Sequence, residues 1–277
     1  MDLVTLLMTH SPMTVLSGAG ISTDSGIPDY RGTGADRRRA PITFREFTHD
    51  PGARRRYWAR SHAGYQYMRQ AQPNRGHVAV THLQHRGVVQ HVITQNVDGL
   101  HQMAGTQNVL DVHGRIDRVR CMACDQVTSR DEFGQRLQRA NRLFVAHGVQ
   151  QAPDGDADLS HQQVADFVVP SCTNCAGILK PDVVFFGESM PRSRRDHASA
   201  WISGSGGLLV LGSSLAVMSG YRLVLQATNA GQPIAILTRG PSRGDHLATV
   251  RIDADLTDVL TNTVERLSLA ADSSTGR

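Results

Sequence analysis

Six short apolar runs, each ending in or followed by glycine or polar residues, constrain the fold of this chain most strongly. They lie at residues 13–17, 88–94, 109–112, 207–212, 233–238 and 249–252. The runs are continuous rather than alternating, which is typical of strands buried on both faces of a parallel sheet. Helix-like stretches lie between or after them, at residues 77–86, 193–203, 221–230 and 258–269. This alternation predicts an α/β fold, a Rossmann-like parallel sheet with helices on both faces.

Two regions interrupt this rhythm and predict a second, smaller domain. Residues 37–75 are rich in arginine and aromatic residues and are expected to form a helical insertion, whereas residues 114–180 contain all four cysteines. We expect both to lie on one side of the sheet, forming a small domain and a cleft. The main domain then comprises residues 1–36, 76–113 and 181–270, and residues 271–277 form a flexible polar tail.

Composition and charge limit the classes of partner. The net charge is +4, and Lys180 is the only lysine among the basic residues. The arginine runs 37–39 and 54–56 could bind anions, but they match no nucleic-acid module and are expected to be solvated surface. No apolar run reaches the roughly 18 residues that span a bilayer, and the first residues resemble no secretory or transit signal. We therefore expect a cytoplasmic monomer with no membrane partner and no specific nucleic-acid partner.

The predicted strand ends indicate a dinucleotide site, because ligands of open α/β sheets bind beyond the carboxyl ends of the strands. Gly18-Ala19-Gly20 follows the first strand, and further polar or glycine-containing ends are Gln95–Asp98, Gly212–Ser214 and Thr238–Gly240. Glycine and small polar residues let backbone N–H groups approach phosphate. A lone Gly-x-Gly could equally be a plain turn, but several such ends together favour NAD. The third glycine of the usual dehydrogenase fingerprint is absent, which argues against simple hydride transfer.

The four cysteines form two C-x2-C pairs separated by 47 residues. Four thiolates suit a closed tetrahedral zinc site, and two such pairs in a cytosolic protein favour metal over disulfides. Redox-active pairs remain the alternative. A closed site leaves no position for a substrate, so we expect one structural zinc bound by Cys121, Cys124, Cys172 and Cys175.

His113 is a candidate catalytic residue because it follows a predicted strand, although a lone histidine is more often structural. Asn96 and Asp98 follow a neighbouring strand, which strengthens the case. The chain has no Gly-x-Ser-x-Gly motif, no phosphate-binding P-loop and no cysteine outside the two pairs. An obvious protein nucleophile is therefore missing.

At this point the motifs resemble those of the sirtuin family. The similarity rests on residues 18–31 (GAGISTDSGIPDYR), 94–101 (TQNVDGLH), His113-Gly114, the cysteine pairs, 180–188 (KPDVVFFGE) and 212–215 (GSSL), and it covers nearly the whole chain. Within the family the chain looks like the class II branch, close to the mitochondrial sirtuin-4 type. The insert around residues 152–156 is part of that likeness.

The resemblance implies an NAD-dependent protein-lysine deacylase that binds acylated lysines in extended peptides. The acyl oxygen attacks C1′ of the nicotinamide ribose, nicotinamide leaves, and the products are lysine and 2′-O-acyl-ADP-ribose. No protein nucleophile is then needed, and His113 acts as general base on a ribose hydroxyl. Mono-ADP-ribosyl transfer from the same site, and a catalytically idle NAD-sensing module, remain alternative functions.

The resemblance also implies the site residues. The catalytic set is His113, Asn96 and Asp98. The cofactor would contact Gly18, Ala19, Gly20, Ile21, Asp29, Tyr30, Arg31, Gln95, Asn96, Val97, Asp98, Gly212, Ser213, Ser214, Thr238, Arg239, Gly240 and Leu256. The peptide would lie beside Val183, Phe185, Phe186, Gly187 and Glu188. Thr238 stands where the family often has asparagine, which puts one cofactor contact in doubt.

The residues that would contact the acyl group of the substrate follow less directly from the resemblance. Relatives that remove acidic acyl groups use a Tyr-x-x-Arg pair, and Tyr57 and Arg60 could be that pair, since guanidinium binds carboxylate with two parallel hydrogen bonds. The alternative is a surface arginine beside packing aromatic residues.

Overall fold

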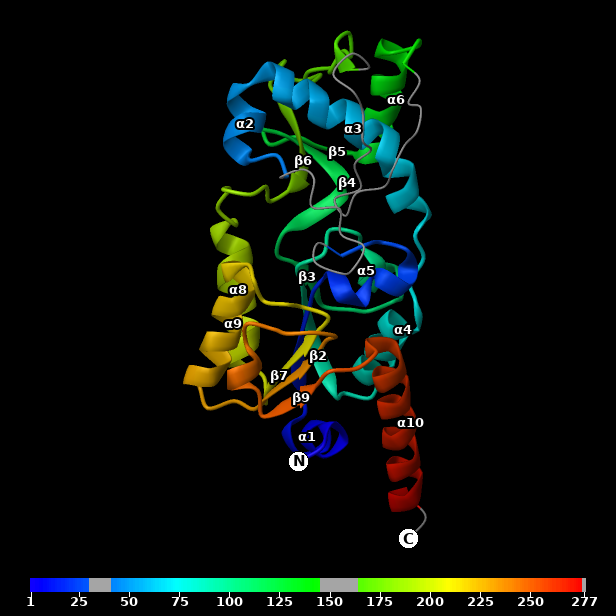
Figure 1. Cartoon of the computed structure of the whole chain (residues 1–277), viewed down its shortest axis with the longest axis vertical. Coiled ribbons are helices and arrows are strands. Elements are labelled where there is room, and N and C mark those ends of the chain that lie inside the picture. Colours follow the sequence, from blue (N-terminus) through cyan, green and yellow to red (C-terminus); the bar gives the residue numbers. More distant parts are fainter. Residues whose placement is uncertain (30–40, 145–163, 276–277) are drawn as a thin grey trace. The chain divides into compact units, whose positions relative to one another are not determined.

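A computed structural model describes residues 1–29, 41–144 and 164–275 of the chain, which forms two compact units. Unit 1 comprises Met1–Gly26, Gln72–Val112 and Met190–Arg277, and unit 2 comprises Ile27–Ala71 and His113–Ser189. Figure 1 labels their elements. Residues 181–189 belong to unit 2 rather than following the main domain, because they begin in a strand that pairs within unit 2.

Unit 1 is built on a six-stranded sheet in the order β3-β2-β1-β7-β8-β9, with every neighbouring pair parallel. The strands are β1 (Met13–Ser17), β2 (Val89–Thr94), β3 (Val109–Asp111), β7 (Leu208–Leu211), β8 (Ile234–Leu237) and β9 (Val250–Ile252). The predicted fold class is confirmed, and each predicted strand is present. The chain runs outward from β1 to β3 and returns at β7, so the order reverses between β1 and β7. The carboxyl ends at such a reversal are where open sheets bind ligands.

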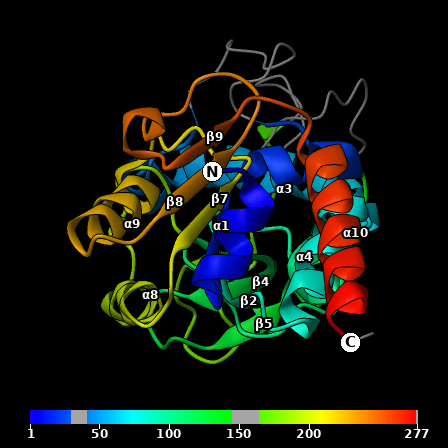
Figure 2. The same cartoon turned by 90° about the horizontal axis from the view of Figure 1, so that it is seen from below.

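Helices cover both faces of this sheet, as Figure 2 shows. Apolar side chains of α1 (Leu3–His10), α4 (Arg75–His85) and α10 (Leu256–Thr275) form one buried cluster with one face of the strands. Those of α8 (Arg192–Ser203) and α9 (Met218–Asn229) form a second cluster with the other face. Along β1, Val15 joins the first cluster and Leu16 the second, because successive side chains point to opposite faces.

The ends of unit 1 depart from the expectation. Helix α1 was not predicted; it begins after Asp2, whose side chain accepts from the Thr5 N–H at 2.8 Å. Helix α10 continues to Thr275, so the expected polar tail is helical over residues 271–275. Ala270 and Ala271 have the highest intrinsic helix propensity, which favours this extension.

Unit 2 contains a three-stranded antiparallel sheet in the order β5-β4-β6. Its strands are β4 (Gly114–Cys121), β5 (Val127–Ser129) and β6 (Leu179–Val183), and its helices are α2 (Phe44–His49), α3 (Pro51–Gln70) and α6 (Arg130–Ala140). The predicted helical insertion is present as α2 and α3. A capping box between Thr43 and Glu46 starts α2, and Pro51 occupies the first turn of α3.

An aromatic cluster forms the core of unit 2. Phe47 contacts Tyr57 edge-on, with ring centroids 5.4 Å apart, and each of these two rings packs against Phe185, at 5.1 and 5.2 Å. Trp58 is fully buried, and its Nε1–H donates to the Leu179 carbonyl at 3.1 Å. These contacts join α2 and α3 to β6 and to the segment that follows it.

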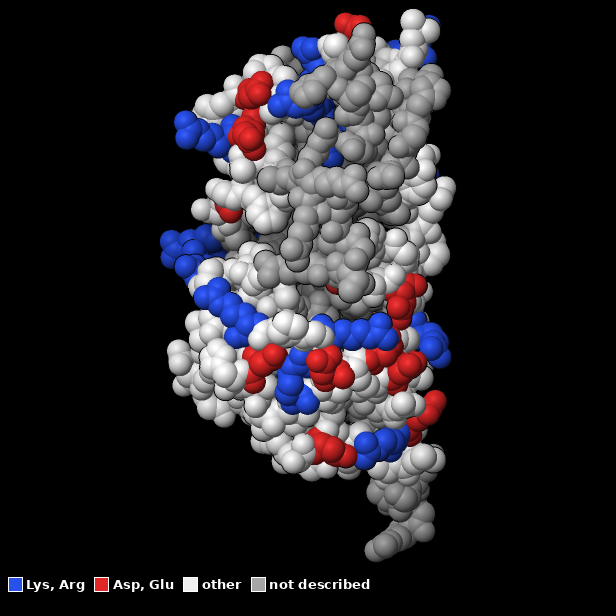
Figure 3. Space-filling model, viewed as in Figure 1, with Lys and Arg blue, Asp and Glu red and all other residues white. Residues whose placement is uncertain are grey.

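The arginines of the run 54–56 contact other residues of unit 2. Figure 3 shows arginine and acidic side chains interspersed on the face in view. Arg54 donates to the Phe47 and Thr48 carbonyls, Arg55 to the Ala165 carbonyl, and Arg56 lies 3.7 Å from Asp50. The run 54–56 therefore has structural partners, and the run 37–39 lies outside the described residues.

None of the described helices is long and apolar enough to cross a membrane.

Candidate active site

The glycine loop after β1 packs against the loop after β7 at the reversal of strand order. A Cβ on Gly18 would lie 2.8 Å from the Ser213 Cβ, and one on Gly20 would lie 2.8 Å from the Gly212 Cα. Gly212 has φ +60°. The Gly20 N–H donates to the Gly212 carbonyl at 2.9 Å. The backbone of these glycines allows close packing of two strand ends, and the N–H groups of Gly18 and Gly20 have protein acceptors. The phosphate contact predicted for the loop stays a prediction.

Polar side chains from the ends of β1, β2 and β7 form hydrogen bonds with one another beside this loop. The Ser213 hydroxyl donates to Gln95 Oε1 at 2.7 Å. The Asn96 amide donates to the Gly18 carbonyl at 3.1 Å and to the Ser22 hydroxyl at 3.0 Å. The Ser22 hydroxyl donates to Asp98 Oδ2 at 2.7 Å. These predicted residues are thus brought together within unit 1.

Two residues of this network were missed. Ser22 links Asn96 to Asp98 and is 1% exposed, and the Asn74 amide donates to the Ile21 carbonyl at 2.8 Å and to Ser25 Oγ at 3.0 Å. Asn74 also caps α4, accepting from the Gly76 N–H at 2.8 Å. An Asn before a helix was a readable signal of a cap. The Ser22–Asp98 contact joins residues 76 positions apart, which no local pattern reveals.

A second group of predicted residues lies at the ends of β8 and β9. Arg239 forms an ion pair with Asp255 at 2.9 Å, and the Gly240 N–H donates to Asp253 Oδ1 at 3.0 Å. Arg251, which the sequence did not single out, donates to the Thr238 carbonyl at 3.0 Å, to the Gly240 and Ile252 carbonyls and to Asp245 Oδ1 at 2.6 Å. A single arginine therefore fixes the backbone of residues 238–240.

The remaining predicted cofactor residues lie in loops and a short helix, in the core of unit 1, or outside the described residues. Ala19 and Ile21 begin and end the short helix η1 (Ala19–Ile21) after β1, Val97 lies in the loop before α5 (Leu100–Met103), and the Ser214 carbonyl accepts from the Arg243 N–H at 3.0 Å. Leu256 is buried in the core of unit 1. Asp29 ends the first described segment and belongs to unit 2, whereas Tyr30 and Arg31 lie outside the described residues.

His113 and the predicted peptide-binding segment lie together in unit 2. The Val184 N–H donates to the His113 carbonyl at 2.8 Å, at the point where β4 and β6 pair. Further along, the Phe44 N–H donates to the Phe186 carbonyl at 2.9 Å. Phe186 is 50% exposed, while Val183 and Phe185 are buried, and Gly187 has φ +76°. His113 belongs to a different unit from Asn96 and Asp98.

Lys180 supports this segment from inside unit 2. Its buried ammonium donates to the Val183 carbonyl at 2.5 Å and to Glu188 Oε2 at 3.1 Å. Glu188 Oε2 also accepts from the Phe185 N–H at 2.8 Å, and the Lys180 nitrogen lies 4.7 Å from the Phe185 ring centroid. The two charges therefore hold both ends of residues 183–188 in place.

Tyr57 and Arg60 lie on the same helix, α3, three positions apart, so they share one side of it. Tyr57 is 6% exposed and packs in the aromatic cluster, and Arg60 is half-buried.

The four cysteines converge in unit 2. All four sulfur atoms lie within 4.8 Å of one another, with Cys121 and Cys175 Sγ at 3.5 Å and Cys124 and Cys172 Sγ at 3.8 Å. Four thiolates at about 2.3 Å from a tetrahedral zinc would be about 3.8 Å apart, which these distances fit. The Ala123 and Asn174 N–H groups donate to Cys121 and Cys172 Sγ, both at 3.4 Å. Such donors stabilise thiolate, so the donor set suits one structural zinc.

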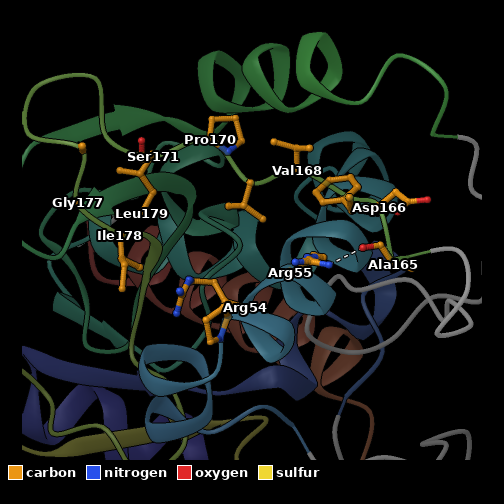
Figure 4. Close-up of a pocket in the computed structure, with 14 residues that line it drawn as sticks. Arg54, Arg55, Ala165, Asp166, Val168, Pro170, Ser171, Gly177, Ile178 and Leu179 are labelled. Carbon is orange, nitrogen blue, oxygen red and sulfur yellow. Dashed lines mark hydrogen bonds between the residues drawn. The ribbon is translucent and has the colours of Figure 1, made fainter.

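A cavity of about 510 Å³ lies elsewhere in unit 2, between the start of α3 and residues 165–171 and 176–179. Figure 4 shows Arg55 reaching the Ala165 carbonyl across one side of it. Among the described residues, none of the predicted catalytic, cofactor-binding, peptide-binding or zinc-binding residues lines this cavity.

The chain is similar to members of one protein family. A model of the Sir2 family matches residues 18–219. The NAD-dependent protein deacetylase 1 of Streptomyces coelicolor is 52% identical over 258 residues, covering 92% of this chain and 86% of the relative. The deacetylase 1 of Mycobacterium avium is 48% identical over 261 residues, covering 92% of each.

Solved structures show the same similarity. A Sir2 complex with a p53 peptide and NAD+ gives a TM-score of 0.77 at 29% identity, covering 97% of this chain and 100% of that one. Sir2 bound to acetylated peptide gives 0.75 at 28% identity, covering 97% and 99%.

Proposed function

The chain belongs to the Sir2 family, and from this premise we propose that it is an NAD-dependent protein deacetylase that releases nicotinamide and 2′-O-acyl-ADP-ribose. The observation that carries the proposal is the hydrogen-bonded series Gly18, Asn96, Ser22 and Asp98 at the reversal of strand order, in a chain 52% identical to a deacetylase. Open sheets bind nucleotides at this position.

The residues of unit 1 would bind and orient NAD as a substrate. Gln95, Asn96 and Asp98 would contact the nicotinamide and its ribose, and residues 238–240 the adenosine. Asp98 is an acceptor for ribose hydroxyls, since an ionised carboxylate accepts hydrogen bonds only. Because the acyl oxygen of the substrate is itself the nucleophile in this chemistry, the absence of a serine or cysteine nucleophile from the sequence is consistent with it.

In unit 2, His113 would act as the general base. An imidazole whose unperturbed pKa is about 6.5 can accept a proton from a ribose hydroxyl near neutral pH, which contributes roughly 10²–10⁴-fold to a rate. The backbone of residues 183–188 would pair with an extended acyl-lysine peptide as an added strand. Zinc would hold the two cysteine loops and supply no chemistry to the reaction.

The test combines acetylated peptide, adenine-labelled NAD and mass detection of the nucleotide product. Wild type is expected to release acetyl-ADP-ribose, and His113→Tyr to lose about 10²-fold or more of that rate. His82→Tyr, at an exposed position of α4, is the matched control. Wild-type turnover by His113→Tyr would remove the proposed base. Label transferred to protein without acylated peptide would instead indicate ADP-ribosyl transfer, which the comparisons do not favour.

Assignment to the class II branch is a finer proposal, supported by the motifs and by the Tyr57-x-x-Arg60 pair; the insert around residues 152–156 lies outside the described residues. If Arg60 reads acidic acyl groups, Arg60→Met lowers the rate on glutaryl and hydroxymethylglutaryl peptides and leaves acetyl peptides unchanged. Arg69→Met, on the same helix, is the control. Equal rates for Arg60→Met and wild type on acidic acyl peptides would leave Tyr57 and Arg60 with a packing role.

We also propose that the protein is a cytoplasmic monomer. Light scattering tests the oligomeric state, and localisation of the tagged protein tests the compartment.

A further inference from the structure

Two histidines that the proposed reaction does not use lie buried in unit 1 and are linked by hydrogen bonds to the Ser17–Ser25 loop. His77, in the first turn of α4, is fully buried, and His101, in α5, is 1% exposed. Their ring centroids are 5.0 Å apart, with the planes at 69°. Buried imidazoles in contact need hydrogen-bond partners, because an unmet buried polar atom destabilises the fold.

Each ring has one nitrogen with a partner. The Asn74 N–H donates to His77 Nδ1 at 3.4 Å, and a backbone N–H can only donate, so the proton of neutral His77 lies on Nε2. His101 Nε2 lies 2.9 Å from the Ser17 hydroxyl at the end of β1. Among the described residues, His77 Nε2 and His101 Nδ1 have no protein partner within hydrogen-bond distance.

The pair is linked to the proposed site by hydrogen bonds at two points. Asn74, whose N–H donates to His77, holds Ile21 and Ser25, and His101 Nε2 contacts the Ser17 hydroxyl. Burial lowers the pKa of His77 to about 4, and the Asp98 carboxylate opposes that shift. Burial lowers the pKa of His101 to about 3. Both rings are thus neutral at neutral pH, which suits a hydrogen-bonding role.

We propose that His77 and His101 are positioning residues: His77 accepts from the Asn74 N–H and so fixes the residue that holds Ile21 and Ser25, while His101 holds Ser17. Together they fix the Ser17–Ser25 loop, and through Ser22 the Asp98 carboxylate, for the nicotinamide ribose of NAD. This inference rests on the proposed function, since the ribose is the ligand that Asp98 would hold.

The decisive variants separate hydrogen bonding from volume. His77→Gln keeps a side-chain acceptor for the Asn74 N–H, as in a capping box, whereas His77→Phe keeps the ring volume and loses the acceptor. We expect Phe to lower kcat/KM for NAD about tenfold or more, Gln to restore most of it, and KM for the acetylated peptide to stay unchanged. His82→Phe on the same helix is the control. A role in packing alone predicts the reverse order, with Phe better than Gln, and that result would overturn the proposal.

Two measurements keep the test independent of turnover and of folding of the variants. Nitrogen-15 NMR of wild type should find both histidines neutral, with His77 protonated on Nε2, because its Nδ1 accepts from the Asn74 N–H; His77 protonated on Nδ1 would overturn the assignment. Calorimetry of NAD binding compares the same variants without catalysis. The two proposals can fail separately. If wild type does not deacetylate peptides, the proposed function is wrong. If His77→Phe binds NAD as tightly as wild type does, the positioning role of the two histidines is wrong.

Discussion

The Ser22 hydroxyl donates to the Asp98 carboxylate at 2.7 Å while it accepts from the Asn96 amide at 3.0 Å. Ser22 is therefore the link between the two predicted catalytic residues of unit 1. A hydrogen bond to a charged group contributes about 1.5–3 kcal/mol, so losing the Ser22 hydroxyl would destabilise the position of the Asp98 carboxylate by about that amount.

We expect Ser22→Ala to lower kcat/KM for NAD by about 10- to 100-fold, the rate equivalent of that energy. Steady-state kinetics with varied NAD measures the effect. Thr23→Ala, at the next and exposed position, should keep wild-type kinetics. An active Ser22→Ala with unchanged kcat/KM would show that Asp98 is held without it.

A second prediction concerns Arg251 and the loop proposed to contact the adenosine of NAD. Its guanidinium fixes the Thr238 and Gly240 carbonyls, which flank Arg239 in the loop proposed to contact adenosine. Arg251→Met should raise KM for NAD about tenfold with kcat within about twofold, because binding rather than the chemical step is weakened. Arg266→Met, whose partner Asp2 is exposed, is the control. Unchanged KM would separate this loop from NAD binding.

The zinc site predicts a dependence of unit 2 on metal. Wild type should contain about one zinc per chain, and Cys124→Ser should lose it and melt at a lower temperature, because zinc binding in such sites is coupled to folding. Thr173→Ser, between the second pair of cysteines, should retain zinc. Elemental analysis and thermal melts measure both quantities. A zinc-free protein of wild-type stability would contradict the assignment.

Buried histidines predict loss of stability in acid. Burial lowers the pKa of His62 and His77 to about 4 and of His101 to about 3. Below an unfolded pKa of about 6.5 the unfolded chain takes up protons that the folded chain does not, so stability is full above pH 6.5 and falls as the pH drops toward 4.

For His77 and His101 this loss is about 1 kcal/mol each at pH 5.5. Urea unfolding at pH 7.5 and 5.5 measures it. His101→Gln should reduce the difference between the two pH values by about the share of one histidine, while His82→Gln should not change it. Identical unfolding curves at both pH values would mean that these rings are already protonated or exposed.

The parallel sheet could be predicted because its strands are short, mostly apolar runs, continuous in β7 and β8 and interrupted by single polar residues or pairs in the others. Strand β4 was not predicted, since its buried positions such as Ile116 and Val119 are separated by arginine and aspartate, and its pairing partner β6 lies about 60 residues away along the chain. Helix α1 was missed because eight residues offer too few turns for a clear period.

The site was predictable where a motif carried it and not where distant residues meet. The strand ends Gln95–Asp98 and Gly212–Ser214 followed from the position of the apolar runs. The contacts of Ser22 with Asp98 and of His101 with Ser17 join residues 76 and 84 positions apart. No periodicity encodes such pairs. Likewise, the packing of Gly20 on Gly212 is visible only once β1 and β7 are neighbours.

The burial of Lys180 has a practical consequence for a protein that acts on lysine. It is the only lysine of the sequence, its side chain is 8% exposed, and its ammonium is held by Glu188. The described surface therefore offers no lysine amine for acylating reagents or for chemical acylation by thioesters. Antibodies against acyl-lysine should give no signal from the enzyme itself, so every acyl-lysine lost in an assay can be attributed to the substrate.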